Sequence, residues 1–207
     1  HGEEWKFAFK MLLRIVMSLY EFTPEWKAEA LYQLEKPRVT YENSDAEIEI
    51  QETLKSRHHI RLKFWELFLN QSKKQNHFFS NVSPGKDSWL TKGIGVGGAY
   101  IDVCITKNSC RSEFIINSGD KELNKKAFDL LYKEYKELIE TNLGHSLNWE
   151  RMDEKISSRI RFELFEVSYF NEEDWNKMIE FLLRSSKNLE NEFKKPIEKI
   201  FNKLKYK

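Results

Sequence analysis

The stretch from residue 99 to residue 117 decides the fold: it reads AYIDVCIT at 99–106, KNS at 107–109 and CRSEFIIN at 110–117. Apolar and polar residues alternate on both sides of the short central segment, which is typical of two antiparallel strands joined by a tight turn. In the register that pairs Thr106 with Ser109, Asp102 lies opposite Glu113. The other face then carries the apolar side chains, namely Ile101, Val103, Ile105, Phe114 and Ile116. The sequence therefore predicts a hairpin with one apolar face and one charged face.

The charged face needs a cation, because Asp102 and Glu113 are like charges placed directly opposite each other. That cation is either a bound metal or the arginines of the same predicted strands, Arg111, Arg159 and Arg161. This arrangement of an Asp and a Glu on two strands resembles the metal site of PD-(D/E)xK nucleases. Those enzymes bind a divalent metal with an Asp and a Glu and have a Lys two residues after the Glu. Ile115 occupies that position here. We therefore favour a structural ion-pair network, which could also form a polar groove for a charged ligand, over a catalytic metal site.

Outside the hairpin, helical and strand-like patterns alternate along the chain. Apolar residues at helical spacing predict helices over 47–70, 121–142 and from 172 onward, and two more strands are expected at 147–153 and 157–167. A loop is expected over 71–98. The order is α-β-β-α-β-β-α, which favours an α+β fold with an antiparallel or mixed sheet packed against helices.

The ends of the predicted helices carry recognisable signals. Asp120 and Asn171 are expected as N-terminal caps, and Asp174, three residues after Asn171, resembles a capping box. Gly144 follows the end of the second helix. Pro196 is expected to bend or interrupt the last helix.

Residues 1–45 are interpreted as a separate, small helical segment. Residues 3–20 are apolar nearly all round, so a helix there needs cover on several sides. A second helix is expected to begin at Thr23-Pro24 and to end before Pro37. The polar, turn-rich residues that follow mark the boundary to an α+β domain over 46–207. The start at His1-Gly2 resembles either a tag remnant or a cut from a longer protein, and in the second case the segment is the remainder of an upstream domain.

Composition bounds the class of protein. The 207 residues are 40% hydrophobic, enough for one sizeable core, and 34 basic residues nearly balance 33 acidic ones. No global field therefore steers the chain toward nucleic acid or an anionic membrane. The longest apolar stretch, 11–20, is far shorter than the roughly 20 residues that span a bilayer. We expect a cytoplasmic protein with no membrane partner.

Several motifs of catalysis or metal binding are incomplete or absent. The glycines of 93–98 lead into a strand and no Gly-Lys-Ser/Thr follows them, so an unusual backbone before a strand is favoured over a phosphate loop. The five histidines form no His-x3-His pair. A short even-numbered turn puts Cys104 and Cys110 on opposite faces, where both stay free, whereas an odd-numbered loop would put them on one face. No cofactor, metal or catalytic residue is expected.

Signals for nucleic-acid binding are local. The chain from Lys194 to Lys207 is a basic amphipathic tail, and Lys73-Lys74 and Lys125-Lys126 form small basic clusters. Such lysines most often form a solvated helix face, and contact with phosphates is the alternative.

From residue 61 onward the chain resembles the family known as domain of unknown function four-two-six-eight. The resemblance rests on an ordered set of short segments: 61–65, 83–87 with Trp89, 93–100, 111–113, Asn124 with Phe128, 139–140, 147–151, 159–160 and 170–175. The family has no agreed activity. Longer proteins with a similar domain carry it behind a restriction-endonuclease-like region, so the resemblance implies nucleic-acid or mobile-element defence work by association.

The expected function is that of an accessory, non-catalytic module of an intracellular defence or DNA-processing protein. It would bind nucleic acid or a partner chain through the charged strand face, and its partners would be DNA or RNA, an upstream nuclease-like domain or a second copy. The rivals are a metal-dependent nuclease that uses Asp102 and Glu113, and a structural dimerisation domain. The candidate binding residues are Arg111, Glu113, Asp102, Trp149, Glu150, Arg159, Arg161 and Lys86.

Overall fold

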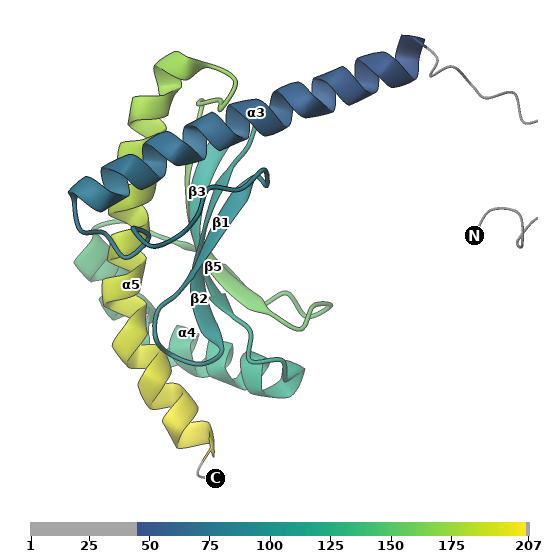
Figure 1. The fold of residues 1–207 in the computed structure, drawn as a ribbon. Coiled ribbons are helices and arrows are strands. Elements are labelled where there is room, and N and C mark those ends of the chain that lie inside the picture. The colour runs from purple at the N-terminus through teal and green to yellow at the C-terminus, as the bar shows by residue number, and fades with distance from the viewer. Residues whose placement is uncertain (1–44, 206–207) are drawn as a thin grey trace, which may run out of the picture. The chain divides into compact units, whose positions relative to one another are not determined.

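The computed structural model describes residues 45–205, with side chains from 56 to 204. Its elements follow the order α3 (Asp45–Lys74), β1 (Trp89–Gly93), β2 (Ala99–Ile105), β3 (Ser109–Ile116), α4 (Lys121–Leu143), β4 (Asn148–Glu150), β5 (Ser158–Phe165), the 3-10 helix η1 (Glu172–Asp174) and α5 (Trp175–Lys205). The α+β fold is confirmed (Figure 1). Residues 1–44 of the helical segment expected over 1–45 lie outside the described residues, which begin at Asp45.

The five strands form one sheet in the order β1-β2-β3-β5-β4, and every neighbouring pair is antiparallel. The predicted hairpin register is confirmed: Asp102 lies opposite Glu113, and the backbone N–H of Thr106 donates to the carbonyl of Ser109 at 2.8 Å. Register fixes which side chains share a face, because successive residues point to opposite sides of the sheet. The hairpin therefore has the apolar and charged faces that the sequence predicts.

The prediction of a loop over 71–98 is wrong in one part, because β1 lies within this range and pairs with β2. Only Leu90 of this five-residue strand is buried, so its sequence gives almost no apolar alternation. The glycines of 93–98 form the connection from β1 to β2. Gly95 and Gly98 have φ angles of 82° and 87°, the unusual backbone that their positions predict.

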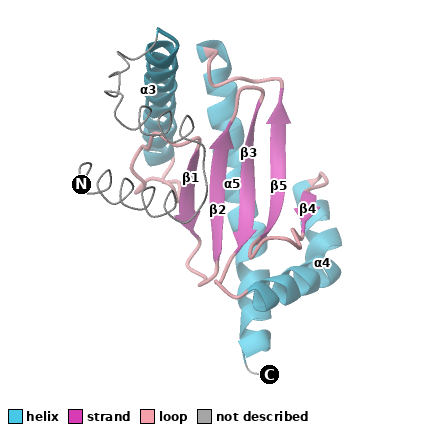
Figure 2. Cartoon of the chain, turned by 90° about the vertical axis from the view of Figure 1, so that its right-hand side faces the viewer, coloured by secondary structure: helices cyan, strands magenta, loops and turns pink. Residues whose placement is uncertain are grey.

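Helix α5 covers the apolar face of the sheet (Figure 2). The rings of Phe114 on β3 and Phe193 on α5 stack at 4.6 Å between centroids, and both side chains are fully buried. Pro196 does not interrupt the helix, which continues to Lys205. Burial of Phe193 before the proline and of Ile197 and Ile200 after it supplies packing that outweighs the lost backbone hydrogen bond.

Helix α3 closes the core with aromatic residues at helical spacing. Phe64, Trp65 and Phe68 are fully buried, and neighbouring rings meet edge to face at 5.2 and 5.7 Å. The indole N–H of Trp65 donates to the carbonyl of Asp87 at 2.9 Å, which ties the loop before β1 to the helix.

The predicted caps are present with one difference. The carboxylate of Asp120 accepts from the N–H of Leu123 at 3.1 Å, and Gly144 ends α4 with a φ of 74°. Asn171 caps η1, the short 3-10 turn that precedes α5. Asp174 does not complete a capping box but accepts from the N–H of Ser168 at 2.9 Å. Among the described residues, no helix combines the length and apolar character that crossing a membrane requires.

Candidate binding site on the charged strand face

The candidate site is the sheet face that α5 does not cover. We name it the charged strand face and define it by its seven charged side chains: Asp102 on β2, Arg111 and Glu113 on β3, Arg159, Arg161 and Glu163 on β5, and Glu150 on β4. The registers place all seven on one side of the pleated sheet. In Figure 2 the described helices α4 and α5 lie behind or below the strands that carry them.

Glu113 is the centre of this face. Its Oε1 lies 2.6 Å from Nε of Arg111 and 3.1 Å from Nη1 of Arg159, so two guanidinium groups share one carboxylate oxygen. The side chain of Glu113 is only 6% exposed, whereas those of the two arginines are 21% and 25% exposed. A carboxylate this deeply buried requires such pairing.

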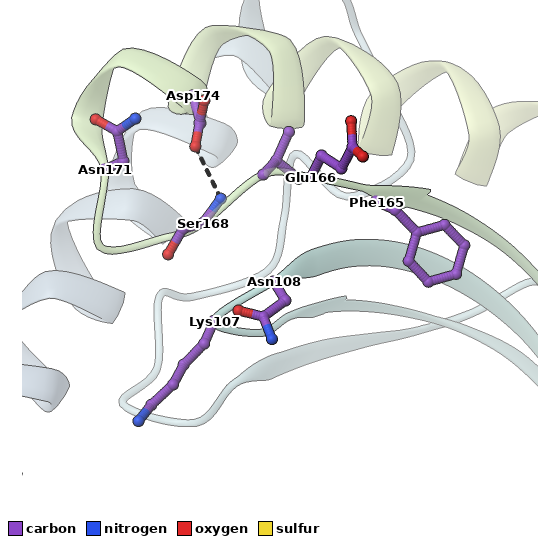
Figure 3. A pocket seen from close by; sticks show the side chains of 8 residues that line it. Lys107, Asn108, Phe165, Glu166, Ser168, Asn171 and Asp174 are labelled. Carbon is purple, nitrogen blue, oxygen red and sulfur yellow. Dashed lines mark hydrogen bonds between the residues drawn. The ribbon is translucent and has the colours of Figure 1, made fainter.

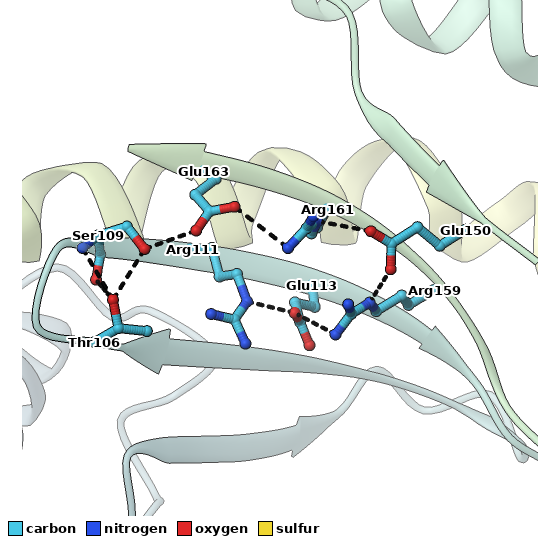
Figure 4. Close-up of polar contacts among 8 residues, drawn as sticks. All are labelled: Thr106, Ser109, Arg111, Glu113, Glu150, Arg159, Arg161 and Glu163. Atoms are coloured by element: carbon cyan, nitrogen blue, oxygen red, sulfur yellow. Dashed lines mark hydrogen bonds and ion pairs between the residues drawn. The ribbon is translucent and has the colours of Figure 1, made fainter. Parts of the chain in front are cut away.

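The network continues across β5 to β4 (Figure 4). Glu150 contacts both Arg159 and Arg161, the latter at 3.0 Å, and Arg161 lies 3.4 Å from Glu163. Nε of Arg161 is within ion-pair distance of Glu150 without the alignment of a hydrogen bond. Ser109 donates to Glu163 at 2.7 Å. Three arginines and three glutamates thus alternate across neighbouring strands, and their charges cancel.

Asp102 stands beside this network rather than within it. Its Oδ1 accepts from the hydroxyl of Thr91 at 2.6 Å, and no ion pair joins it to a described basic residue. Burial raises the pKa of Asp102 to about 6, against the opposing hydrogen bond from Thr91 and with a further contribution from the charge of Glu113. Around neutral pH, Asp102 is therefore the carboxylate of this face with the least compensation of its negative charge.

The geometry favours ion pairing over metal chemistry at this face. The carboxylate of Glu113 already contacts two arginines, and the side chain two residues later is the buried, apolar Ile115. Among the described residues, no group of three His, Cys, Asp or Glu side chains is placed to hold a metal ion. Of the two kinds of cation that the sequence allows at this face, the arginines are therefore the ones that pair with Glu113.

Comparison with known proteins gives one match. The family model described as Domain of unknown function (DUF4268) matches residues 60–197, two thirds of the chain. The chain belongs to the DUF4268 family. No curated protein and no solved structure matches it.

Segments that carry the family resemblance meet at one end of the DUF4268 core. Phe64 of α3 packs edge to face on Trp175 at the start of α5, with 5.6 Å between ring centroids. The indole N–H of Trp175 donates to the carbonyl of Tyr169 at 2.9 Å, and Arg61 lies over the ring of Tyr169 at 5.4 Å. These segments therefore hold the two long helices and the loop between β5 and η1 together.

Two of the eight candidate residues lie away from the charged strand face. Trp149 is opposite Ile160 on the apolar face, where its indole donates to Glu140 at 3.0 Å and its ring packs on Phe193 at 5.7 Å. Lys86 is exposed in the loop before β1, and its carbonyl is 3.4 Å from Nη1 of Arg61. The other six belong to the ion-pair network or lie beside it.

The prediction from the sequence also omitted two residues of this face, Trp89 and Glu163. Trp89 lies in the cross-strand row that contains Cys104, Arg111 and Glu163, and half of its surface is exposed. Glu163 follows Arg159 and Arg161 in the same alternation, which is the signal that could have identified it. Trp89 gave no such signal, because the strand that carries it was expected to be a loop.

The two cysteines are not reactive groups of the site. Cys104 lies on the charged strand face and Cys110 on the apolar face, as the even-numbered turn predicts, and both are free. Burial raises the pKa of each thiol to about 12, so the thiolate form is scarce at neutral pH.

Proposed function

We propose that this chain is a non-catalytic recognition module whose charged strand face binds a partner polypeptide chain. The observation that carries the proposal is the balanced array of three arginines and three glutamates with an exposed Trp89 in the same cross-strand row. Arginine and tryptophan are enriched among the residues that dominate protein–protein binding energy. The arginine side chains are already held by neighbouring carboxylates, so they lose little conformational entropy on binding.

The balance of charge favours a protein partner over nucleic acid at this face. A polyanion laid along the strands would meet Glu113, Glu150 and Glu163 as often as the arginines, and ionised Asp102 would add a further negative charge. A protein surface with both signs of charge can match such an alternating pattern, which also sets register and specificity. The family resemblance adds the context of an intracellular defence or DNA-processing assembly.

The test begins with the mass of the full chain in solution, measured by light scattering over a range of concentrations. A mass above the monomer value of 24.9 kDa identifies a second copy as the partner. If the chain is a monomer, proteins retained by the immobilised chain are identified, purified and titrated against it. Only binding of the purified partner counts as support.

The decisive variants are Trp89→Ala and Arg161→Glu. Each should weaken association by roughly tenfold or more, because central aromatic and arginine side chains carry most of the energy of an interface. Leu138→Ala and Lys133→Glu on α4 are matched controls, since both residues are exposed and distant in sequence from the face. Equal affinities for wild type and both face variants would contradict the proposal.

One observation supports a second candidate, a metal-dependent nuclease. Asp102 and Glu113 face each other across two strands, and Asp102 has no described cationic partner. A divalent cation between the two carboxylates would supply one. Magnesium should then raise the melting temperature of the wild type and leave that of Glu113→Gln unchanged, whereas the recognition proposal expects no effect on either.

A further inference from the structure

A second surface lies at the end of the sheet where the β2–β3 turn meets the segment that follows β5. We name it the strand-end rim and define it by Lys107, Asn108, Phe165, Glu166 and Phe170. Backbone bonds hold its two sides together: the N–H of Glu166 donates to the carbonyl of Asn108 at 3.1 Å, and that of Tyr169 to the carbonyl of Thr106 at 3.5 Å. The rim is therefore a fixed part of the fold rather than two independent loops.

The rim contains a hollow with a volume of about 520 Å³, within the range of small-molecule sites (Figure 3). Its lining includes Val167 and the ring of Phe165, and Phe165 is 64% exposed although it is a large aromatic side chain. Polar groups at its edges include the amide of Asn108 and the carboxylate of Glu166. Asp174 also lines it but is already engaged by the N–H of Ser168.

Lys107 joins the hollow, which it lines, to a neighbouring pair of aromatic rings. The ammonium group of Lys107 lies 6.0 Å from the centroid of the Phe170 ring, which is 42% exposed. The Phe170 ring stacks on that of Tyr169 at 4.2 Å, and the guanidinium of Arg61 lies 5.4 Å from the centroid of the Tyr169 ring. Each ring of this aromatic pair therefore has a basic group beside it.

Arg61 has unused hydrogen-bonding capacity. Its Nε is buried without a partner, and its contacts to the carbonyl of Lys86 and the hydroxyl of Tyr169 are both long, at 3.4 Å. No described carboxylate lies within ion-pair distance of its guanidinium. The half-buried guanidinium of Arg61 can therefore form a hydrogen bond with an anionic oxygen of a ligand. Such charge-assisted hydrogen bonds are stronger than those between neutral groups.

We propose that the strand-end rim binds single-stranded nucleic acid. One base stacks on Phe165 inside the hollow, where Glu166 and Asn108 face its edge, and a neighbouring base stacks on Phe170. Phosphates of the same strand approach Lys107 and, beyond the Tyr169–Phe170 stack, Arg61 with Lys86. Exposed aromatic rings interleaved with cations are the usual platform for unpaired bases. This proposal does not rest on partner binding at the charged strand face.

The polar groups of the hollow also define a base preference. A carboxylate accepts hydrogen bonds from the exocyclic amino group of cytosine, and thymine has no such group. Glu166 therefore favours oligocytidylate over oligothymidylate. A duplex should bind weakly, because its bases are paired and stacked and cannot reach the two phenylalanine rings.

The test is fluorescence anisotropy with labelled single-stranded oligocytidylate and the full chain. Affinity should fall steeply as salt rises from about 50 to about 200 mM, because phosphate contacts release counterions. Phe165→Ala, Phe170→Ala and Lys107→Gln should each weaken binding roughly tenfold at low salt. Glu166→Gln should reduce the preference for oligocytidylate over oligothymidylate.

Leu138→Ala serves again as a control, here together with Lys133→Gln, and both should bind as the wild type does. All substituted residues are exposed, so thermal unfolding should show each variant folded. Three results would overturn the proposal: no binding at about 50 mM salt, binding that the three rim variants leave unchanged, or equal affinity for duplex and single strand.

Discussion

At the scale of single residues, Asp102 and Glu113 face each other across two strands, but their neighbours give the two carboxylates different surroundings. Glu113 contacts two guanidinium groups, whereas Asp102 contacts only the hydroxyl of Thr91. Burial is the main cause that raises the pKa of Asp102 from 3.8 to about 6, so ionisation of this side chain opposes folding. The two residues are therefore expected to respond oppositely to loss of their charge.

Asp102→Asn should stabilise the protein at pH 8 by about 1 kcal/mol, a figure reduced from the full pKa shift because the side chain is only partly buried. The folded-state pKa is raised, so the wild type is most stable with respect to this group below pH 4 and loses that stability as pH rises through about 6. The gain should therefore shrink between pH 8 and pH 4. Urea unfolding across this range measures it.

The exposed Glu154→Gln is the control for Asp102→Asn, because it changes the same charge outside the network. It should leave the unfolding free energy nearly constant with pH. A gain for Asp102→Asn that is as large at pH 4 as at pH 8 would show that ionisation of Asp102 is not its cause.

Glu113→Gln should lower stability by an amount on the order of 1 kcal/mol, because it removes one carboxylate from two arginines. Added magnesium should change the melting temperature of neither protein. In the Glu113→Gln background the gain from Asp102→Asn should be smaller, since part of the repulsion on Asp102 is already gone. Calorimetry of the double-mutant cycle measures the coupling, and strictly additive effects would contradict it.

Residue-level prediction from the sequence succeeded where period-two alternation was strong. The pairing of Asp102 with Glu113 and the separation of the two cysteines follow from the turn at Lys107-Asn108-Ser109 alone. The side of β4 that carries Trp149 did not follow, because β4 has only three residues and no turn fixed its register beforehand. Arg61 belongs to a segment of the family resemblance, but nothing in the sequence indicated its unmet hydrogen bonds, since they depend on a loop and a ring more than twenty residues away.

At the scale of elements, α4 is fastened to the segment between β4 and β5 by a buried lysine. The ammonium group of Lys125 donates to the carbonyls of Arg151, Met152 and Ser157 and to the hydroxyl of Ser158, at 2.5 to 3.1 Å. Lys125 is 4% exposed. The sequence placed this residue in a small basic cluster, whereas the structure gives it a structural role.

Lys125→Met should destabilise the protein by about 3 kcal/mol, because several buried acceptors lose their donor at once. Lys126→Met, at the exposed neighbouring position, should cost far less. Hydrogen exchange should show faster exchange in the segment 151–157 for Lys125→Met only. Equal unfolding free energies for the two variants would mean that the four contacts contribute nothing.

Long elements were predicted more accurately than short ones. Helix α4 was expected over 121–142 and spans Lys121–Leu143, because its apolar spacing and both caps agree. Strand β1 was missed because it buries a single apolar residue and depends on pairing with β2. The effect of Pro196 was misjudged for a related reason, since tertiary packing along α5 decides whether the helix continues.

At the scale of the whole molecule, the α+β class follows from the alternation of helical and strand patterns, and the functional surfaces do not. Both surfaces combine residues from separate elements: three strands supply the ion-pair network, and two connections supply the strand-end rim. Overall charge balance gave no information about either. Under the function proposed here, the charged strand face is a recognition surface without a reaction centre.

The presence or absence of chemistry is tested most directly by incubating the full chain with end-labelled DNA and RNA, single- and double-stranded, in magnesium or manganese. All substrates should remain intact, because Glu113 is held by two arginines and no lysine follows it at the required spacing. Metal-dependent products that disappear with Glu113→Ala and persist with Glu154→Ala would contradict a recognition module and establish a nuclease.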